Sequence, residues 1–326
     1  MIASHVDLPG ASFPTTRLGF GCAYIVGGWQ TRASLRQLDA AFDAGYRHFD
    51  VAPPYGLGTA EAILGKALVG RRDKVTVATK IGIVRPQHSN ALLLARSLAR
   101  PVRKFLPSVS KSMGVAMYSA ATQRRQFAPA VIAKSLDESR RALNTERIDL
   151  LLLHEVMLAD LTDDLLTYLS REKSLGSIGS IGTATSVAET SLIRQVYGRI
   201  FDVWQHSWDL SLDSEEYDHF TITHRVLSGS HVYLKKNPSV LAILSDECGM
   251  DLADPLLLNR LLIGVALAAN PNGVVLASSR NPSHILANAS TLHDEYLAEV
   301  CKKFLRHVRL ARSSDQSVDK GDSLSS

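Results

Sequence analysis

The chain has 326 residues, of which 45% are hydrophobic and 21% charged, a mixture typical of globular proteins with a large core. The N-terminus lacks the basic and apolar regions of a signal peptide, and apolar runs such as 261–269 are too short to span a membrane. Three scattered cysteines show neither metal-site spacing nor a disulfide framework, which favours a reducing compartment. We therefore predict a cytoplasmic protein without a transmembrane segment; the oligomeric state is not predicted.

The net charge of +4 is unevenly distributed along the chain. Residues 85–127 contain eight Lys or Arg and no acidic residue, whereas the rest carries 28 of the 36 basic residues and all 32 acidic ones. A mildly acidic body with one basic segment argues against a general nucleic-acid-binding surface, so we expect no nucleic-acid partner.

Short apolar runs alternate with amphipathic stretches along the chain, which is typical of repeated strand–helix units. The predicted strands are 17–22, 46–50, 74–80, 148–154, 177–183, 201–206, 220–226 and 273–277. The predicted helices are 33–44, 58–69, 129–143, 162–173, 187–197, 230–246 with 254–269, and 282–307. The exception follows the sixth strand, where residues 211–217 leave room for about two helical turns at most. Eight such units predict an α/β fold, a single (β/α)8 TIM barrel. The alternative doubly wound sheet would show a Gly-x-Gly-x-x-Gly turn, but residues 19–24 (Gly-Phe-Gly-Cys-Ala-Tyr) lack the third glycine.

Two segments fall outside this repeat. We expect residues 1–312 to form the barrel, with a long insertion after the third strand at 85–127, and the polar residues 313–326 to be a disordered tail. The insertion begins directly after the third strand, which predicts a basic lid over the active site that favours anionic substrates. A short helix on an anionic membrane surface and a solvated loop without function are the alternatives.

Four polar residues follow the ends of predicted strands, where barrel enzymes carry their catalytic groups. Asp50 ends the second strand and Tyr55 follows five residues later, while Lys80 and His154 end the third and fourth strands. A lysine ammonium lowers the pKa of a nearby tyrosine, an aspartate can hold the lysine in place, and a histidine can orient a carbonyl. No metal site is indicated, so this set predicts hydride transfer coupled to proton transfer.

These segments also resemble a known family. Residues 46–68, which include the run Tyr-Gly-Leu-Gly-Thr-Ala-Glu, are similar to the aldo-keto reductase segment that carries the Asp and Tyr of its catalytic tetrad. Residues 77–82 (Val-Ala-Thr-Lys-Ile-Gly) and 148–154 (Ile-Asp-Leu-Leu-Leu-Leu-His) resemble the strands with its Lys and His. The resemblance runs from about residue 17 to about residue 288, is strongest to aldose and galactose dehydrogenase-like branches, and implies Tyr55 as the general acid.

The last strand–helix unit, residues 273–288, resembles the phosphate-binding unit of the same family. The resemblance implies NADP(H) as cofactor, with NAD(H) as the alternative, and the cofactor contacts Gly21, Asp50, Gln205, Ser278, Ser279, Arg280, His284 and Asn288. Hydroxyls and backbone N–H groups at a helix start attract phosphate, and an arginine can bind a 2′-phosphate. An ordinary helix cap at Asn281 or Ser279 is the alternative.

The sequence departs from the family at several cofactor positions. Ala184-Thr185 stands where relatives often have Ser-Asn, His224 where an aromatic ring commonly stacks, and His284 and Ala287 replace Gln and an acidic residue. The main prediction is an NADP(H)-dependent oxidoreductase that interconverts an aldehyde, ketone or aldose with its oxidised or reduced partner. The alternatives are a cofactor-binding regulatory subunit with little turnover, and an aldolase that uses Lys80 to form a Schiff base.

Overall fold

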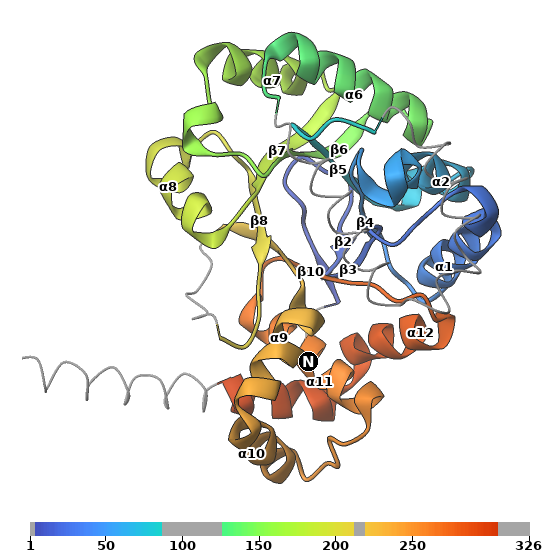
Figure 1. Cartoon of the computed structure of the whole chain (residues 1–326), viewed down its shortest axis with the longest axis vertical. Coiled ribbons are helices and arrows are strands. Elements are labelled where there is room, and N and C mark those ends of the chain that lie inside the picture. The colour runs from blue at the N-terminus through green and yellow to red at the C-terminus, as the bar shows by residue number, and fades with distance from the viewer. Residues whose placement is uncertain (1–3, 87–125, 212–218, 306–326) are drawn as a thin grey trace, which may run out of the picture.

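A closed barrel of eight parallel strands forms the centre of the molecule (Figure 1). The computed structural model describes residues 4–86, 126–211 and 219–305. Around the barrel the strand order is β10-β3-β4-β5-β6-β7-β8-β9. The strands are β3 (Leu18–Gly21), β4 (His48–Asp50), β5 (Thr76–Ile81), β6 (Ile148–His154), β7 (Ile178–Ala184), β8 (Val203–Ser207), β9 (Phe220–His224) and β10 (Val274–Ala277). The predicted barrel is confirmed, and the doubly wound alternative is wrong.

Helices surround the barrel on its outer face (Figure 1). They are α1 (Thr31–Asp43), α2 (Ala60–Ala67), α6 (Pro129–Leu143), α7 (Asp163–Ser174), α8 (Val187–Tyr197), α9 (Val226–Lys236), α10 (Pro238–Cys248), α11 (Pro255–Ala269) and α12 (Pro282–Ser290), followed by a helix over residues 295–305. Short 3-10 turns are η1 (Gly28–Gln30), η2 (Tyr55–Gly58), η3 (Arg72–Lys74), η4 (Leu158–Asp160) and η5 (Thr291–His293). Within the described ranges, no helix is long and apolar enough to cross a membrane.

Two predicted helices are divided in the structure. The helix predicted over 230–246 begins earlier, at Val226, and is interrupted before Pro238, whose ring lacks the N–H that a continuous helix needs. The helix predicted over 282–307 stops at Ser290, and the Asp294 carboxylate accepts a hydrogen bond from the Leu297 amide at 2.9 Å to start a separate helix. Both corrections concern local cap and proline chemistry inside a correctly predicted strand–helix unit.

Three segments considered from the sequence lie outside the described ranges: most of the insertion (87–125), most of the stretch 211–217 after β8, and the tail (313–326). The two ends of the insertion are described. The Gln126 amide donates to the Gly82 carbonyl at 2.8 Å, and a Cβ on Gly82 would lie 2.5 Å from the Phe127 ring. The chain therefore returns to the barrel beside the point where it leaves.

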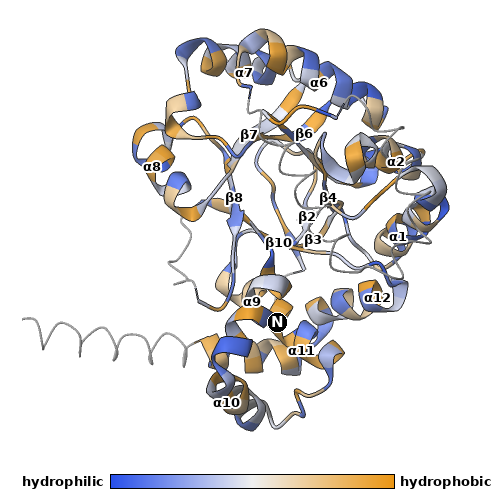
Figure 2. Ribbon diagram, viewed as in Figure 1, coloured by the Kyte–Doolittle hydropathy of each residue, from blue (hydrophilic) through white to orange (hydrophobic). Residues whose placement is uncertain are grey.

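The apolar core forms two layers, because successive side chains of a strand point to opposite faces. Inside the barrel, Ala78, Leu150, Leu152 and Ile222 belong to one buried cluster. Alternate residues of the same strands, such as Val77, Leu151 and Leu153, belong to a larger cluster that includes residues of the surrounding helices. The helix α11 is apolar along most of its length (Figure 2) and is buried from Leu261 to Leu267.

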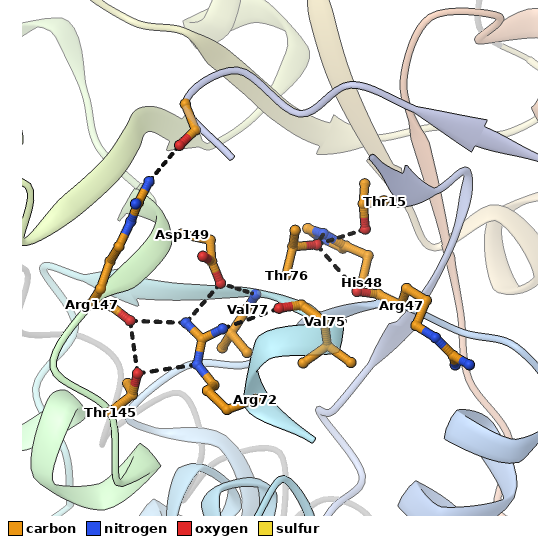
Figure 3. A network of polar contacts seen from close by, with 11 residues as sticks. Thr15, Arg47, His48, Arg72, Val75, Thr76, Val77, Thr145, Arg147 and Asp149 are labelled. Carbon is orange, nitrogen blue, oxygen red and sulfur yellow. Dashed lines mark hydrogen bonds and ion pairs between the residues drawn. The ribbon is translucent and has the colours of Figure 1, made fainter. Parts of the chain in front are cut away.

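An N-terminal hairpin, β1 (His5–Val6) and β2 (Thr15–Thr16), lies at the amino ends of the barrel strands. Leu8 joins the cluster inside the barrel, and the Arg147 guanidinium donates to the Gly10 carbonyl at 2.5 Å. Beside it, the Arg72 guanidinium bonds Asp149 at 2.7 Å, while Asp149 accepts from the Val77 amide at 2.8 Å (Figure 3). This network covers the amino ends of the strands, so the carboxyl ends are left for the site.

Candidate active site

The four residues of the predicted tetrad lie on three adjacent strands and on the turn that follows the first of them. Asp50 ends β4, Lys80 lies one residue before the end of β5, and His154 ends β6. Tyr55 begins the turn η2 directly after β4. Because β4 pairs with β5 and β5 with β6, the structure brings the four side chains to one edge of the barrel.

Lys80 and Asp50 form a buried ion pair. The Lys80 Nζ lies 2.6 Å from Oδ1 and 2.5 Å from Oδ2 of Asp50, and Gln205 Nε2 donates to Asp50 Oδ2 at 2.8 Å. Burial would raise the pKa of the Asp50 carboxyl, but the charge of Lys80 and the hydrogen bonds from Lys80 and Gln205 outweigh it and lower that pKa. Asp50 is therefore a carboxylate that anchors the Lys80 ammonium, and Gln205 belongs to the same hydrogen-bond network.

The turn that carries Tyr55 has an unusual backbone. Gly56, Leu57 and Gly58 have φ values of 60°, 58° and 86°, and a Cβ on Gly56 would lie 2.0 Å from the Ile25 carbonyl oxygen. The Tyr55 ring lies edge-on to His154, with ring centroids 6.1 Å apart, and the Lys80 Nζ is 5.5 Å from the Tyr55 ring centroid. The turn thus places the phenol beside both an ammonium and an imidazole.

His154 is a neutral imidazole at physiological pH. Burial, reinforced by the positive charge of Lys80, lowers the pKa of His154 to about 3. Its Nδ1 has no hydrogen-bond partner among the described residues, although the atom is buried. A buried polar atom without a protein partner favours a bound ligand or water at this position.

Two further residues close to the tetrad carry polar groups. His224 ends β9, and burial lowers its pKa to about 4, with the charge of Asp50 opposing the shift. The Trp208 amide donates to the His224 carbonyl at 3.0 Å, and the buried Trp208 Nε1 has no hydrogen-bond partner in the described part of the chain. Trp208 was not among the predicted site residues, although its position just after β8 was a usable signal.

The start of α12 has the geometry of a capped helix. The Asn281 side chain accepts from the Ser283 amide at 3.0 Å, and Ser279 Oγ accepts from the Asn281 amide at 3.1 Å. Asn281 therefore caps this helix, an arrangement compatible with a phosphate at the helix start, and neighbouring Arg280 is exposed. The Arg280 guanidinium lies over the Tyr24 ring, 5.0 Å from its centroid. His284 is exposed on the first turns of the same helix.

Other predicted cofactor residues gather beside this helix start. Gly21 ends β3, and a Cβ built on it would lie 3.9 Å from Ser278 Oγ, so small groups line the space between β3 and β10. Asn288 is 3% exposed, and its Oδ1 has no hydrogen-bond partner in the described structure. An orphaned buried amide oxygen, small side chains and an arginine at a helix start fit a phosphate-bearing dinucleotide.

A second ion pair was not predicted from the sequence: the buried Glu61 carboxylate pairs with the partly buried Arg85 guanidinium. Glu61 is the acidic residue of the Tyr-Gly-x-Gly-x-x-Glu run, so its place in that motif was the available signal. Arg85 was counted among the eight basic residues of the insertion. Its pairing with Glu61 neutralises one of these charges, and the other seven lie in residues 87–125, outside the described ranges.

Comparison with known proteins gives the family. The family model described as "Aldo/keto reductase family" matches residues 17–213, more than half of the chain. The chain belongs to the aldo/keto reductase family.

Two curated relatives bear names that describe an activity. A D-threo-aldose 1-dehydrogenase from Pseudomonas sp is 32% identical over 157 residues, which are 47% of this chain and 44% of that protein. A pyridoxal 4-dehydrogenase from Microbacterium luteolum is 25% identical over 328 residues, covering 95% of this chain and 84% of the relative. The chain thus aligns with less than half of the first relative and with most of the second.

Solved structures support the fold. A glycerol dehydrogenase from Gluconobacter oxydans superposes with a TM-score of 0.68 at 19% identity and 96% coverage of both chains. An aldo-keto reductase from Klebsiella pneumoniae in complex with NADPH superposes with a TM-score of 0.63 at 18% identity, covering 93% of this chain and 96% of that one. At these identities the likeness concerns the barrel architecture.

Proposed function

We propose that this protein is a nicotinamide-dependent oxidoreductase that interconverts an aldehyde, ketone or aldose with its reduced or oxidised partner. The observation that carries the proposal is the placement of Tyr55 beside the buried Lys80–Asp50 pair and the neutral His154. Tyrosine, lysine and histidine around one point are the groups that a coupled hydride and proton transfer requires.

Each tetrad residue has a role in moving one proton. In the reducing direction the Tyr55 hydroxyl donates its proton to the substrate oxygen, and in the oxidising direction the Tyr55 phenolate removes it. The Lys80 ammonium, held by Asp50, stabilises the phenolate. Neutral His154 donates a hydrogen bond to the substrate oxygen and orients it toward Tyr55. A bound nicotinamide would supply or accept the hydride at the substrate carbon.

Residues at the β3 and β10 ends would hold this cofactor. We assign Ser278, Ser279 and the α12 backbone to phosphate, and Asn288 to a polar group that satisfies its orphaned amide oxygen. Gly21 leaves room for close approach, exposed Arg280 and His284 flank the adenosine end, and Gln205 and Asp50 lie at the nicotinamide end. Exposed Arg280 favours NADP(H) over NAD(H), because an arginine can pair with a 2′-phosphate.

The test is an assay of carbonyl reduction and aldose oxidation with both dinucleotides, comparing the wild type with Tyr55→Phe. We expect Tyr55→Phe to bind dinucleotide normally and to lower kcat by roughly 10²–10⁴-fold. Tyr296→Phe, which changes an exposed tyrosine, is the matched control and should keep full activity. Near-normal turnover of Tyr55→Phe would refute the proton-donor role.

A regulatory, cofactor-binding subunit is the second candidate. The observation that favours it is the changed nicotinamide end, where buried Ala184 and Thr185 and the imidazole of His224 replace the groups common in relatives. Tight dinucleotide binding without turnover of any aldehyde, ketone or aldose would support this function over catalysis. The aldolase alternative is disfavoured, because both Asp50 oxygens bond the Lys80 Nζ, the atom that would have to be free to attack a carbonyl and form a Schiff base.

A further inference from the structure

A partly buried ion pair lies on the outer side of β5, behind the tetrad. Glu61 of α2 is 0% exposed, and its carboxylate pairs with the Arg85 guanidinium. The other carboxylate oxygen accepts a hydrogen bond from Thr79 Oγ1 at 2.6 Å. Because neighbouring residues of a strand point to opposite faces, Thr79 bonds Glu61 outside the barrel while the next residue, Lys80, faces the tetrad.

The same arginine contacts the turn that carries Tyr55. Arg85 Nη1 donates to the Gly58 carbonyl at 2.7 Å. Gly58 has a φ of +86°, and a Cβ built on it would lie 3.1 Å from Arg85 Cγ and 3.5 Å from Pro86. The Arg85 side chain therefore packs closely on the last residue of the turn, three residues after Tyr55.

The turn itself depends on such outside contacts. Leu57 has a φ of 58°, and a non-glycine residue in the left-handed region is strained because its Cβ crowds the backbone. On the other side of the turn, Thr59 Oγ1 donates to the Gly56 carbonyl at 2.7 Å and accepts from the Gly27 amide at 2.8 Å. Arg85 is thus the contact that ties the turn to the strand of Lys80, whereas Thr59 ties it to the loop after β3.

We propose that the Arg85–Glu61 pair is a positioning element for Tyr55, which sets the separation between the Tyr55 hydroxyl and the Lys80 ammonium. Tyr55 is joined to β5 by the tetrad inside the barrel and also by the contacts Gly58–Arg85–Glu61–Thr79 outside it. The attraction between a phenolate and an ammonium weakens with distance, so a turn released from β5 makes Tyr55 a weaker acid. The inference rests on the proposed function, in which Tyr55 exchanges the proton.

The direct test measures the pH at which Tyr55 ionises, without any cofactor or substrate. The ultraviolet absorbance titration of each protein is compared with that of the same protein carrying Tyr55→Phe, so that the difference isolates Tyr55. For Arg85→Met we expect Tyr55 to ionise about one pH unit higher than in the wild type. The matched control is Arg71→Met, which removes another arginine ion pair, Arg71–Asp39 at 2.7 Å, and should cause no shift.

Kinetics provide the second readout. Arg85→Met should lower kcat roughly ten- to a hundredfold with a smaller change in KM, because misplacement of a reacting group affects the transition state. Arg85→Lys, which can reach one of the two acceptors, should restore part of both effects. If Arg85→Met does not fold, Thr79→Val gives the same test from the other end of the chain of contacts, with a smaller shift in the same direction.

The outcomes separate this proposal from the proposed function. An unchanged ionisation of Tyr55 in a folded Arg85→Met or Thr79→Val protein would overturn the positioning role, and so would an equal shift in Arg71→Met. A wild-type protein without carbonyl or alcohol turnover would refute the proposed function, whereas the tyrosine titration would still decide whether Arg85 positions Tyr55.

Discussion

A histidine inside the barrel should make the fold sensitive to mild acid. His48 of β4 is 0% exposed, its Nδ1 lies 2.9 Å from Thr76 Oγ1, and a Cβ on Gly19 would lie 2.9 Å from its ring. Burial lowers the pKa of His48 from 6.5 to about 4, with Asp50 opposing and Lys80 reinforcing the shift. The folded protein therefore keeps this ring neutral at a pH where the unfolded chain binds a proton.

The sign and size of the effect follow from this difference. Above pH 6.5 neither state protonates His48 and the full stability is present; as the pH falls from 6.5 to about 4, the unfolded state gains the proton first and stability is lost. Each pKa unit corresponds to about 1.4 kcal/mol, so His48 should cost about 2 kcal/mol at pH 5 and about 3 kcal/mol near pH 4. Urea unfolding of the wild type and His48→Gln at about pH 7 and about pH 5 measures this loss.

His48→Gln should lose less of its free energy of unfolding than the wild type over this range. Exposed His231→Gln, which removes a hydrogen bond to Asn259 at 2.8 Å, is the control and should keep the wild-type pH dependence. Equal pH dependence in the wild type and a folded His48→Gln would refute the reasoning. An NMR titration of the wild-type His48 ring provides an independent check, because a ring that titrates near pH 6.5 would contradict the lowered pKa.

Three other predictions concern the tetrad, the cofactor end and the amino end of the barrel. Lys80→Met should lower kcat by roughly 10²–10⁴-fold and move the alkaline limb of the kcat–pH profile upward; an unchanged profile would contradict its role toward Tyr55. Arg280→Ala should weaken NADPH binding roughly ten- to a hundredfold in a fluorescence titration and change NADH binding little. Equal losses of affinity for both dinucleotides would show that Arg280 does not bind the 2′-phosphate. Asp149→Ala leaves the Arg72 guanidinium and the Val77 amide without their shared acceptor, and should lower the free energy of unfolding by about 2–3 kcal/mol in urea with kcat unchanged; a loss below about 0.5 kcal/mol would contradict this role.

Most of the barrel could be predicted because the spacing of apolar residues along the chain distinguishes its strands from its helices. The strand over Ile148–His154 and the helices over Pro129–Leu143 and Val187–Tyr197 lie where alternating apolar runs and amphipathic stretches predict them. The breaks before Pro238 and at Asp294 were missed, because an apolar face continues across them while the backbone changes direction. The hairpin β1–β2 was also missed, since strands of two residues carry almost no periodic signal.

In the candidate site, too, some residues could be predicted from the sequence and others could not. Asp50, Lys80 and His154 could be placed together because parallel strands put their carboxyl ends at one edge. The Glu61–Arg85 pair could not be predicted, because it joins a helix to a residue beyond the end of β5. Only the folded chain shows that contact. The charge count had grouped Arg85 with the insertion, whereas its partner in space is the motif around Tyr55.

The hydrogen bond between Gln126 and Gly82 allows this barrel to carry an inserted segment of variable length between β5 and α6. Since the Gly82 carbonyl and the Gln126 amide are hydrogen-bonded, the segment between these two residues is closed at its base whatever its length. The entropy of closing a loop grows slowly, by about 0.6 kcal/mol for each doubling of length. During evolution this stretch can therefore be extended, shortened or exchanged at little cost to folding, while Tyr55, Lys80 and His154 stay in register, so that relatives can diverge by insertion rather than by change within the barrel.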